Sequence, residues 1–166
     1  MDSGLGRVFA VKTCIGDLVG DDAAALVNPV NCMGVIEPGL AAQFRRRWPA
    51  HHSAYLALCQ KRRLRPGVLL ITQAQDTKQQ LIAFPARRHW NDPVRLEDIE
   101  IGLLGVRQLL GEGGIASIAV PPLGCGLGGL DWHHVRQRII AALRPYPVEL
   151  RLYEPIPDST PLRAIA

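Results

Sequence analysis

Four glycines within six consecutive positions form the segment of this chain that points most directly to a chemistry. Residues 121–132 read Pro-Pro-Leu-Gly-Cys-Gly-Leu-Gly-Gly-Leu-Asp-Trp, after an apolar strand-like run and before a helical pattern. Glycines let several backbone N–H groups approach a ligand together, and a helix N-terminus adds partial positive charge. The segment therefore predicts a phosphate-binding loop. A glycine-rich turn without a ligand is the alternative, because the spacing matches neither of the common phosphate-binding fingerprints.

A second candidate loop, residues 28–41, contains two asparagines three positions apart at the end of an apolar strand pattern. Asn28 and Asn31 offer amide donors and acceptors without charge, which suits ribose hydroxyls or a carbonyl group. Gly34 and Gly39 permit a close approach of the backbone to a ligand before the next helix begins. A local Asx-turn is the alternative for either asparagine. The deeper position in the loop favours a ligand contact for Asn31.

The elements that position these loops alternate along the chain. Hydrophobic periodicity and breaker residues predict strands at 8–14, 23–30, 68–72, 81–84, 115–121 and 148–153, and helices at 39–47, 51–63, 95–110 and 132–144. Asp131 is the expected N-cap of the last helix. The alternation predicts an α/β fold in three layers, with a mixed, mostly parallel sheet between helices.

Ligands of such sheets bind beyond the carboxyl ends of the strands. The loops at 28–41, 85–92 and 121–131 all follow predicted strands, so we expect them to meet along one edge of the sheet. Residues 1–154 are predicted to form one domain, and residues 155–166, rich in proline and polar residues, a loose tail.

Composition limits the functional classes. With 166 residues, 48% of them hydrophobic, the chain suits one soluble domain. No apolar run approaches the ~20 residues of a membrane span, so we expect a cytoplasmic protein without membrane contact, and a monomer. Four scattered cysteines argue against a zinc ribbon and a disulfide framework, and we predict no metal site and no cofactor.

Basic residues exceed acidic ones by four and gather in runs at 45–47, 61–63 and 87–88. Such runs favour anionic partners, including nucleic acid. Solvated helix ends are the alternative, because positive charge suits a helix C-terminus. Aromatic residues are not interleaved with the basic runs, so nothing indicates a surface for stacking bases.

The motifs, in this order, resemble those of the macrodomain family, a three-layer α/β/α fold that binds ADP-ribose. The resemblance covers residues 1–154 and rests on Gly-Asp-Leu at 16–18, Ala-Leu-Val-Asn-Pro-Val-Asn at 25–31 and the glycine-rich segment. Within the family, Asn-Cys-Met-Gly-Val at 31–35 and Gly-Leu-Ala-Ala-Gln-Phe at 39–44 are similar to the DarG antitoxin group. DarG proteins remove ADP-ribose from DNA bases that the partner toxin DarT has modified.

Carried over residue by residue, the resemblance implies that Asp17 binds the adenine amino group and that Asn31 contacts the distal ribose. The loop at 34–41 would enclose the diphosphate from one side, and backbone N–H groups of the glycine-rich segment from the other. The residues predicted to bind ADP-ribose are Asp17, Leu18, Asn28, Asn31, Gly34, Val35, Gly39, Leu40, Gly124, Cys125, Gly126, Leu127 and Gly128. The predicted catalytic residues are Asn31, Arg87 and His89.

The chain departs from the patterns of the DarG group and of related hydrolases at three places. Arg87 stands near the position of a lysine that is the leading catalytic candidate in that group, and arginine cannot form a Schiff base with a sugar. Related human-type hydrolases carry an aspartate where this chain has Gly128. Glu37, Pro38 and Gly39 replace a Gly-Lys-Gly sequence, which removes a positive charge.

His89 has the ordinary pKa best suited to proton transfer near neutral pH, with a structural role beside Trp90 as the alternative. The leading hypothesis is an ADP-ribosyl glycohydrolase that acts on ADP-ribosylated nucleic acid, with a DarT-like toxin as an expected partner. The alternatives are a non-catalytic ADP-ribose reader, a phosphatase for ADP-ribose 1″-phosphate, and an antitoxin that acts by contact alone.

Overall fold

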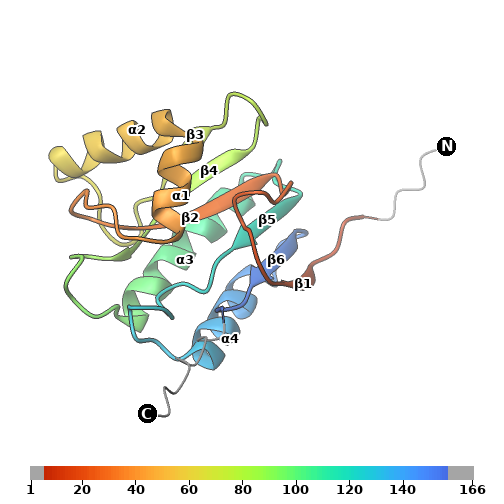
Figure 1. Cartoon of the computed structure of the whole chain (residues 1–166). Coiled ribbons are helices and arrows are strands. Elements are labelled where there is room, and N and C mark those ends of the chain that lie inside the picture. The colour runs from red at the N-terminus through yellow and green to blue at the C-terminus, as the bar shows by residue number, and fades with distance from the viewer. Residues whose placement is uncertain (1–5, 157–166) are drawn as a thin grey trace, which may run out of the picture.

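The structure is a computed structural model that describes residues 6–156, which fold into three layers (Figure 1). The strands are β1 Ala10–Cys14, β2 Ala25–Asn31, β3 Leu70–Gln73, β4 Gln80–Arg87, β5 Ser117–Val120 and β6 Glu149–Tyr153. The helices are α1 Leu40–Arg47, α2 Pro49–Gln60, α3 Leu96–Gly111 and α4 Trp132–Leu143. The strand order is β1-β6-β5-β2-β4-β3, with β3 antiparallel to β4 and the other pairs parallel. The predicted mixed, mostly parallel sheet is confirmed.

Helices cover both faces of the sheet because the central strands are apolar on both sides. In β2, Val27 belongs to a core cluster with residues of α3 and α4. Val30, three positions later, packs on the opposite face with Tyr55 of α2. Leu26 belongs to a third cluster with Phe44 of α1. Figure 1 shows the same arrangement, with α1 and α2 on one side of the sheet and α3 and α4 on the other.

The ends of the helices follow local chemistry. Helix α2 begins at Pro49, two residues before the predicted start. Proline is favoured at this position because the backbone N–H groups of the first helical turn have no partner within the helix, so the missing N–H of proline costs nothing. Asp131 is the N-cap of α4, as predicted, and its carboxylate accepts a hydrogen bond from the backbone N–H of His134 at 3.2 Å. Trp48 ends α1 and caps α2, so one residue forms the corner between the two helices.

Strand β6 ends at Tyr153, close to the predicted domain boundary at residue 154. Most of the predicted tail, residues 155–166, lies outside the described residues. Between residues 6 and 156, no helix combines the length and apolarity needed to cross a bilayer.

Candidate functional site

A cavity of about 270 Å³ opens at the carboxyl end of the central strands. Three segments far apart in the sequence form its walls: the loop after β2 with the start of α1, the end of β4, and the loop after β5. The lining residues are Pro29, Val30, Glu37, Pro38, Leu40, Ala41, Ala86, Arg87, Val94, Pro121, Pro122, Gly124, Gly126, Leu127 and Gly128. The loops expected to meet at one edge of the sheet therefore share one cavity.

The glycine-rich loop presents unpaired backbone donors to this cavity. Its shape is fixed by hydrogen bonds from Leu130 N to Gly124 O at 2.9 Å and from Val94 N to Gly128 O at 3.1 Å. Within residues 6–156, the N–H groups of Gly126, Leu127 and Gly128 make no hydrogen bond. Three consecutive free N–H groups on a cavity wall form a site suited to an anion.

Glycine is required at two positions of this loop for steric reasons. A Cβ atom on Gly128 would lie 2.6 Å from the carbonyl oxygen of Gly124 and 2.5 Å from a methyl carbon of Val94. Gly124 has φ +74° and its Cβ would also collide with Val94. By contrast, a Cβ on Gly126 would meet nothing within 4 Å. The path of the loop therefore requires glycine at positions 124 and 128, whereas open space lies beside Gly126.

The start of α1 forms the opposite wall. Gly39, at φ 111°, is its N-cap and offers no side-chain cap, and within the described part of the chain the N–H groups of Leu40, Ala41 and Ala42 have no acceptor. Leu40 and Ala41 line the cavity. Free N–H groups at a helix N-terminus attract anions. Two walls of backbone donors thus face one cavity, an arrangement that suits two linked phosphates.

Glu37 and Arg87 form an ion pair in the same cavity. Arg87 Nη1 donates to Glu37 Oε1 at 3.0 Å and to the carbonyl oxygen of Trp90 at 2.7 Å. The side chain of Glu37 is 29% exposed and that of Arg87 is 10% exposed. The prediction for Arg87 did not anticipate this partner, which lies fifty positions earlier in the chain. The sequence did contain a signal for this ion pair, because the two residues carry opposite charges on two loops that were expected to meet at one edge of the sheet.

Asn31 is buried at the end of β2, and its side chain organises the loop that follows. Its Oδ1 accepts hydrogen bonds from the backbone N–H groups of Met33 at 3.0 Å and Val35 at 3.3 Å, and its Nδ2 donates to the carbonyl oxygen of Val35 at 2.6 Å. The hydroxyl of Tyr55 also donates to this side chain and to the carbonyl oxygen of Asn31. The Asx-type contacts considered from the sequence are thus present, and a contact with the ribose stays a prediction.

Asn28 lies further back along β2, where its side chain reaches a residue of α2. Its Nδ2 is 3.3 Å from His51 Nε2, and His51 Nδ1 is 2.7 Å from the hydroxyl of Thr72. Burial, with a smaller effect from the charge on His52, lowers the pKa of His51 to about 4. Asn28 Oδ1 is buried without a hydrogen-bond partner among the described residues. The side chain of Asn28 therefore links β2 to α2, and it is not part of the cavity wall.

The other predicted residues occupy varied positions. Leu40, Gly124, Gly126, Leu127, Gly128 and Arg87 line the cavity, whereas Asp17, Leu18, Gly34, Val35, Gly39, Cys125 and His89 do not. Asp17 is exposed and the side chain of Leu18 is buried in the core. Gly34, at φ +78°, packs closely against Leu56 and Cys59 of α2. Their contacts with a ligand stay predictions.

Three residues with reactive side chains stand outside the cavity lining. The ring of His89 stacks on Trp90 with centroids 5.4 Å apart, and its Nδ1 accepts a hydrogen bond from Asn91 N. Burial raises the pKa of Cys125 to about 11, and that of Cys32 to the same range, so both stay thiols at neutral pH. Among residues 6–156 no three His, Cys, Asp or Glu side chains gather as a metal site.

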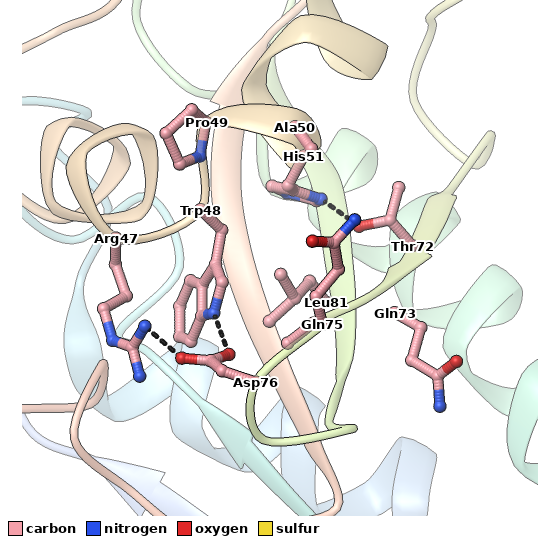
Figure 2. Close-up of a pocket in the computed structure, with 11 residues that line it drawn as sticks. Arg47, Trp48, Pro49, Ala50, His51, Thr72, Gln73, Gln75, Asp76 and Leu81 are labelled. Carbon is pink, nitrogen blue, oxygen red and sulfur yellow. Dashed lines mark hydrogen bonds and ion pairs between the residues drawn. The ribbon is translucent and has the colours of Figure 1, made fainter.

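A second cavity, of about 310 Å³, lies between the start of α2 and the turn joining β3 to β4 (Figure 2). Figure 2 shows the side chains of Arg47 and Trp48 directed toward Asp76, and His51 directed toward Thr72. Most of the charged and hydrogen-bonding groups here already bind one another. A ligand would have to displace these contacts, so the first cavity is the better candidate.

The fold and the two donor-lined walls define an α/β domain with a cavity suited to an anion. The Macro domain family profile matches residues 27–139, which is more than half of the chain. The chain therefore belongs to the macrodomain family, and the resemblance drawn from its motifs is confirmed.

Individual relatives show which macrodomain proteins this chain is similar to. A DNA ADP-ribosyl glycohydrolase of Mycobacterium tuberculosis is 40% identical over 153 residues, which cover 90% of this chain and 44% of that protein. The macrodomain of Mycobacterium tuberculosis DarG has a TM-score of 0.85 at 38% identity, covering 89% of this chain and 99% of that one. Thermosipho africanus DarTG in complex with ADP-ribose has a TM-score of 0.77 at 30% identity, covering 88% of this chain and 43% of that one. The chain spans less than half the length of the curated relatives that match most of it.

Proposed function

We propose that this chain binds ADP-ribose in the cavity between α1 and the glycine-rich loop. The single observation that carries the proposal is the pair of facing walls with free N–H groups, at Gly126, Leu127 and Gly128 and at the start of α1. Backbone donors can neutralise a diphosphate without a metal ion or a cationic side chain. The proposed contacts of Asp17 with adenine and of Asn31 with the distal ribose extend the ligand from this diphosphate in both directions.

We further propose that the chain hydrolyses an ADP-ribosyl linkage on a DNA base. Support comes from relatives named DNA ADP-ribosyl glycohydrolase and from the positive net charge of the chain. Cleavage of an N-glycosidic bond passes through an oxocarbenium-like state, which a held diphosphate and a positioned ribose help to reach. A DarT-like toxin is the proposed biological partner, because one relative is a fusion of a DNA ADP-ribosyl transferase with a DNA ADP-ribosyl glycohydrolase.

A non-catalytic reader is the second candidate, and a specific observation favours it. Arg87, which stands near the expected position of a catalytic lysine, is held by Glu37 and by the carbonyl oxygen of Trp90. A guanidinium in this state can neither accept a proton nor form a covalent adduct. If no other group of the cavity does chemistry, ADP-ribose would bind and nothing would turn over.

Two measurements on the same preparation test these functions. Calorimetric titration with ADP-ribose measures binding, and incubation with thymidine- and guanine-ADP-ribosylated oligonucleotides measures release of free ADP-ribose. Binding with release would support the hydrolase. Binding without release on DNA, on modified protein or on ADP-ribose 1″-phosphate would leave the reader, whereas phosphate release from the last substrate alone would favour the phosphatase. No binding would contradict the proposed site.

A further inference from the structure

The cavity contains one carboxylate that a site for diphosphate would not be expected to have. Among its lining residues, Glu37 and Arg87 are the two with ionisable side chains, and the rest are glycine, proline or apolar residues. A carboxylate close to two phosphates opposes binding by Coulomb repulsion. We therefore expect Glu37 to have a role other than binding the ligand.

The ion pair holds this carboxylate by one oxygen. Arg87 Nη1 is bound to Glu37 Oε1 at 3.0 Å and, by its second contact, to the carbonyl oxygen of Trp90 in the turn after β4. Over residues 6–156 the other oxygen, Oε2, has no hydrogen bond. Arginine keeps its charge at any physiological pH, so Glu37 keeps this partner, with one oxygen held and the other available.

The other groups near the cavity are poorly placed to move a proton. The thiols of Cys32 and Cys125 are half-buried, and this burial raises their pKa values to about 11. Both polar atoms of the Asn31 side chain bind its own loop, and His89 lies outside the lining. Glu37 is thus the one available base on the described part of the wall.

We propose that Glu37 is the general base of the hydrolysis and that Arg87 positions it, an inference that rests on the proposed function. A water molecule attacks the anomeric carbon of the distal ribose, and a C–O bond forms as the bond from that carbon to the base nitrogen breaks. The bonding electron pair leaves with the nitrogen. Glu37 takes the proton of the water, and this proton then passes to the departing nitrogen, so the products are ADP-ribose and the unmodified base.

Glu37→Gln tests the assignment, because glutamine keeps the shape and can still accept a hydrogen bond from Arg87. The expected result is a fall of about 100-fold or more in release of ADP-ribose from the modified oligonucleotide. ADP-ribose should bind as tightly as before or more tightly, since a repulsive charge is gone. Glu112→Gln, at an exposed position just after α3, is the matched control and should change neither quantity.

The possible results distinguish a wrong role for Glu37 from a wrong proposed function of the whole site. Turnover by Glu37→Gln within about threefold of the unsubstituted protein would overturn the role of Glu37 while leaving a hydrolase. Weaker binding of ADP-ribose together with slower turnover would also overturn it, in favour of a structural role. Binding without turnover by the unsubstituted protein would overturn the proposed hydrolase, and the general base with it. Formate should restore part of the rate of Glu37→Ala, because it supplies the missing carboxylate.

Arg87→Met tests the positioning role through kcat at saturating concentrations of the modified oligonucleotide. Loss of the guanidinium removes the hydrogen bond that holds Glu37 Oε1, so kcat should fall by about tenfold. Arg87→Lys keeps a cationic donor at this position and should recover most of the lost rate. Equal values of kcat in the two variants, or no fall in Arg87→Met, would contradict this role.

Discussion

The neutral charge of the candidate cavity decides how it can attract an anion. The opposite charges of Glu37 and Arg87 lie 3.0 Å apart and largely cancel at the distance of a bound phosphate. Attraction must then come from the free N–H groups of the two walls. Affinity for ADP-ribose should therefore depend on the shape of the backbone at the glycine-rich loop more than on any cationic side chain.

Gly126→Glu is expected to lower the affinity for ADP-ribose by at least about 100-fold, because a carboxylate would enter the path of the phosphates. The fold should survive, since a Cβ at this position meets nothing within 4 Å. Calorimetric titration measures the affinity, and thermal unfolding checks the fold. Gly126→Ala, which adds the Cβ without the charge, should bind ADP-ribose within a few-fold of the unsubstituted protein. Unchanged binding by Gly126→Glu would mean that the phosphates lie elsewhere.

His51 should make stability depend on pH. Its pKa is about 4 in the folded protein because of burial, against an ordinary value near 6.5. The unfolded chain thus binds more protons between these values, so the free energy of unfolding should fall by about 3 kcal/mol as the pH drops from 6.5 to 4. Urea unfolding at a series of pH values measures this slope. It should flatten in His51→Gln and persist in the control His134→Gln; equal slopes in both would contradict the assignment.

At the scale of elements, α3 approaches β4 through a glycine. A Cβ on Gly102 would lie 2.2 Å from the ring of Phe84, which is fully buried. This close approach sets how the helix packs on the strand that ends at Arg87. The position of one cavity wall therefore depends on a helix residue that never contacts the cavity.

Gly102→Ala should destabilise the protein by about 1–3 kcal/mol, although alanine favours helix formation, because overpacking outweighs the gain in propensity. Gly111→Ala at the end of the same helix is the matched control. Its Cβ would rest 3.7 Å from Tyr146, an ordinary contact, so this change should be neutral or slightly stabilising. Chemical denaturation measures both changes. Equal stability of the two variants would show that the ring of Phe84 moves aside at no cost.

The sequence predicted the elements and their layers because strand and helix patterns alternate along the chain. In the structure, apolar residues on both sides of β2 and β4 pack against helices on both faces. It also predicted that three loops share an edge, since parallel strands place their carboxyl ends together. Periodicity does not determine where a loop side chain turns. Asn31 is directed into its own loop by the backbone of Val35, and Glu37 meets Arg87 across the cavity. Both contacts depend on the three-dimensional path of the chain.

The structure separates two of the basic runs. Arg47, at the end of α1, pairs with Asp76 and lines the second cavity, whereas the start of α1 lines the candidate site. The run at 61–63 follows α2, whose last turns pack on Gly34 in the loop that leads to Glu37. If ADP-ribosylated DNA is the substrate, as proposed, the exposed run at 61–63 is the better placed of the two to bind the backbone of the DNA strand.

The double variant Lys61→Gln with Arg63→Gln should lower kcat/KM on an ADP-ribosylated oligonucleotide roughly three- to tenfold while leaving the affinity for free ADP-ribose unchanged. The dependence of log kcat/KM on log salt concentration should also become less steep by about 1, because fewer phosphates are neutralised. The matched control, Arg45→Gln with Arg46→Gln, removes the same charge from the end of α1 and should change the rate little. Equal losses in the two double variants would mean that net charge, and not the run at 61–63, attracts the DNA. No loss in either would place the strand on another surface of the domain.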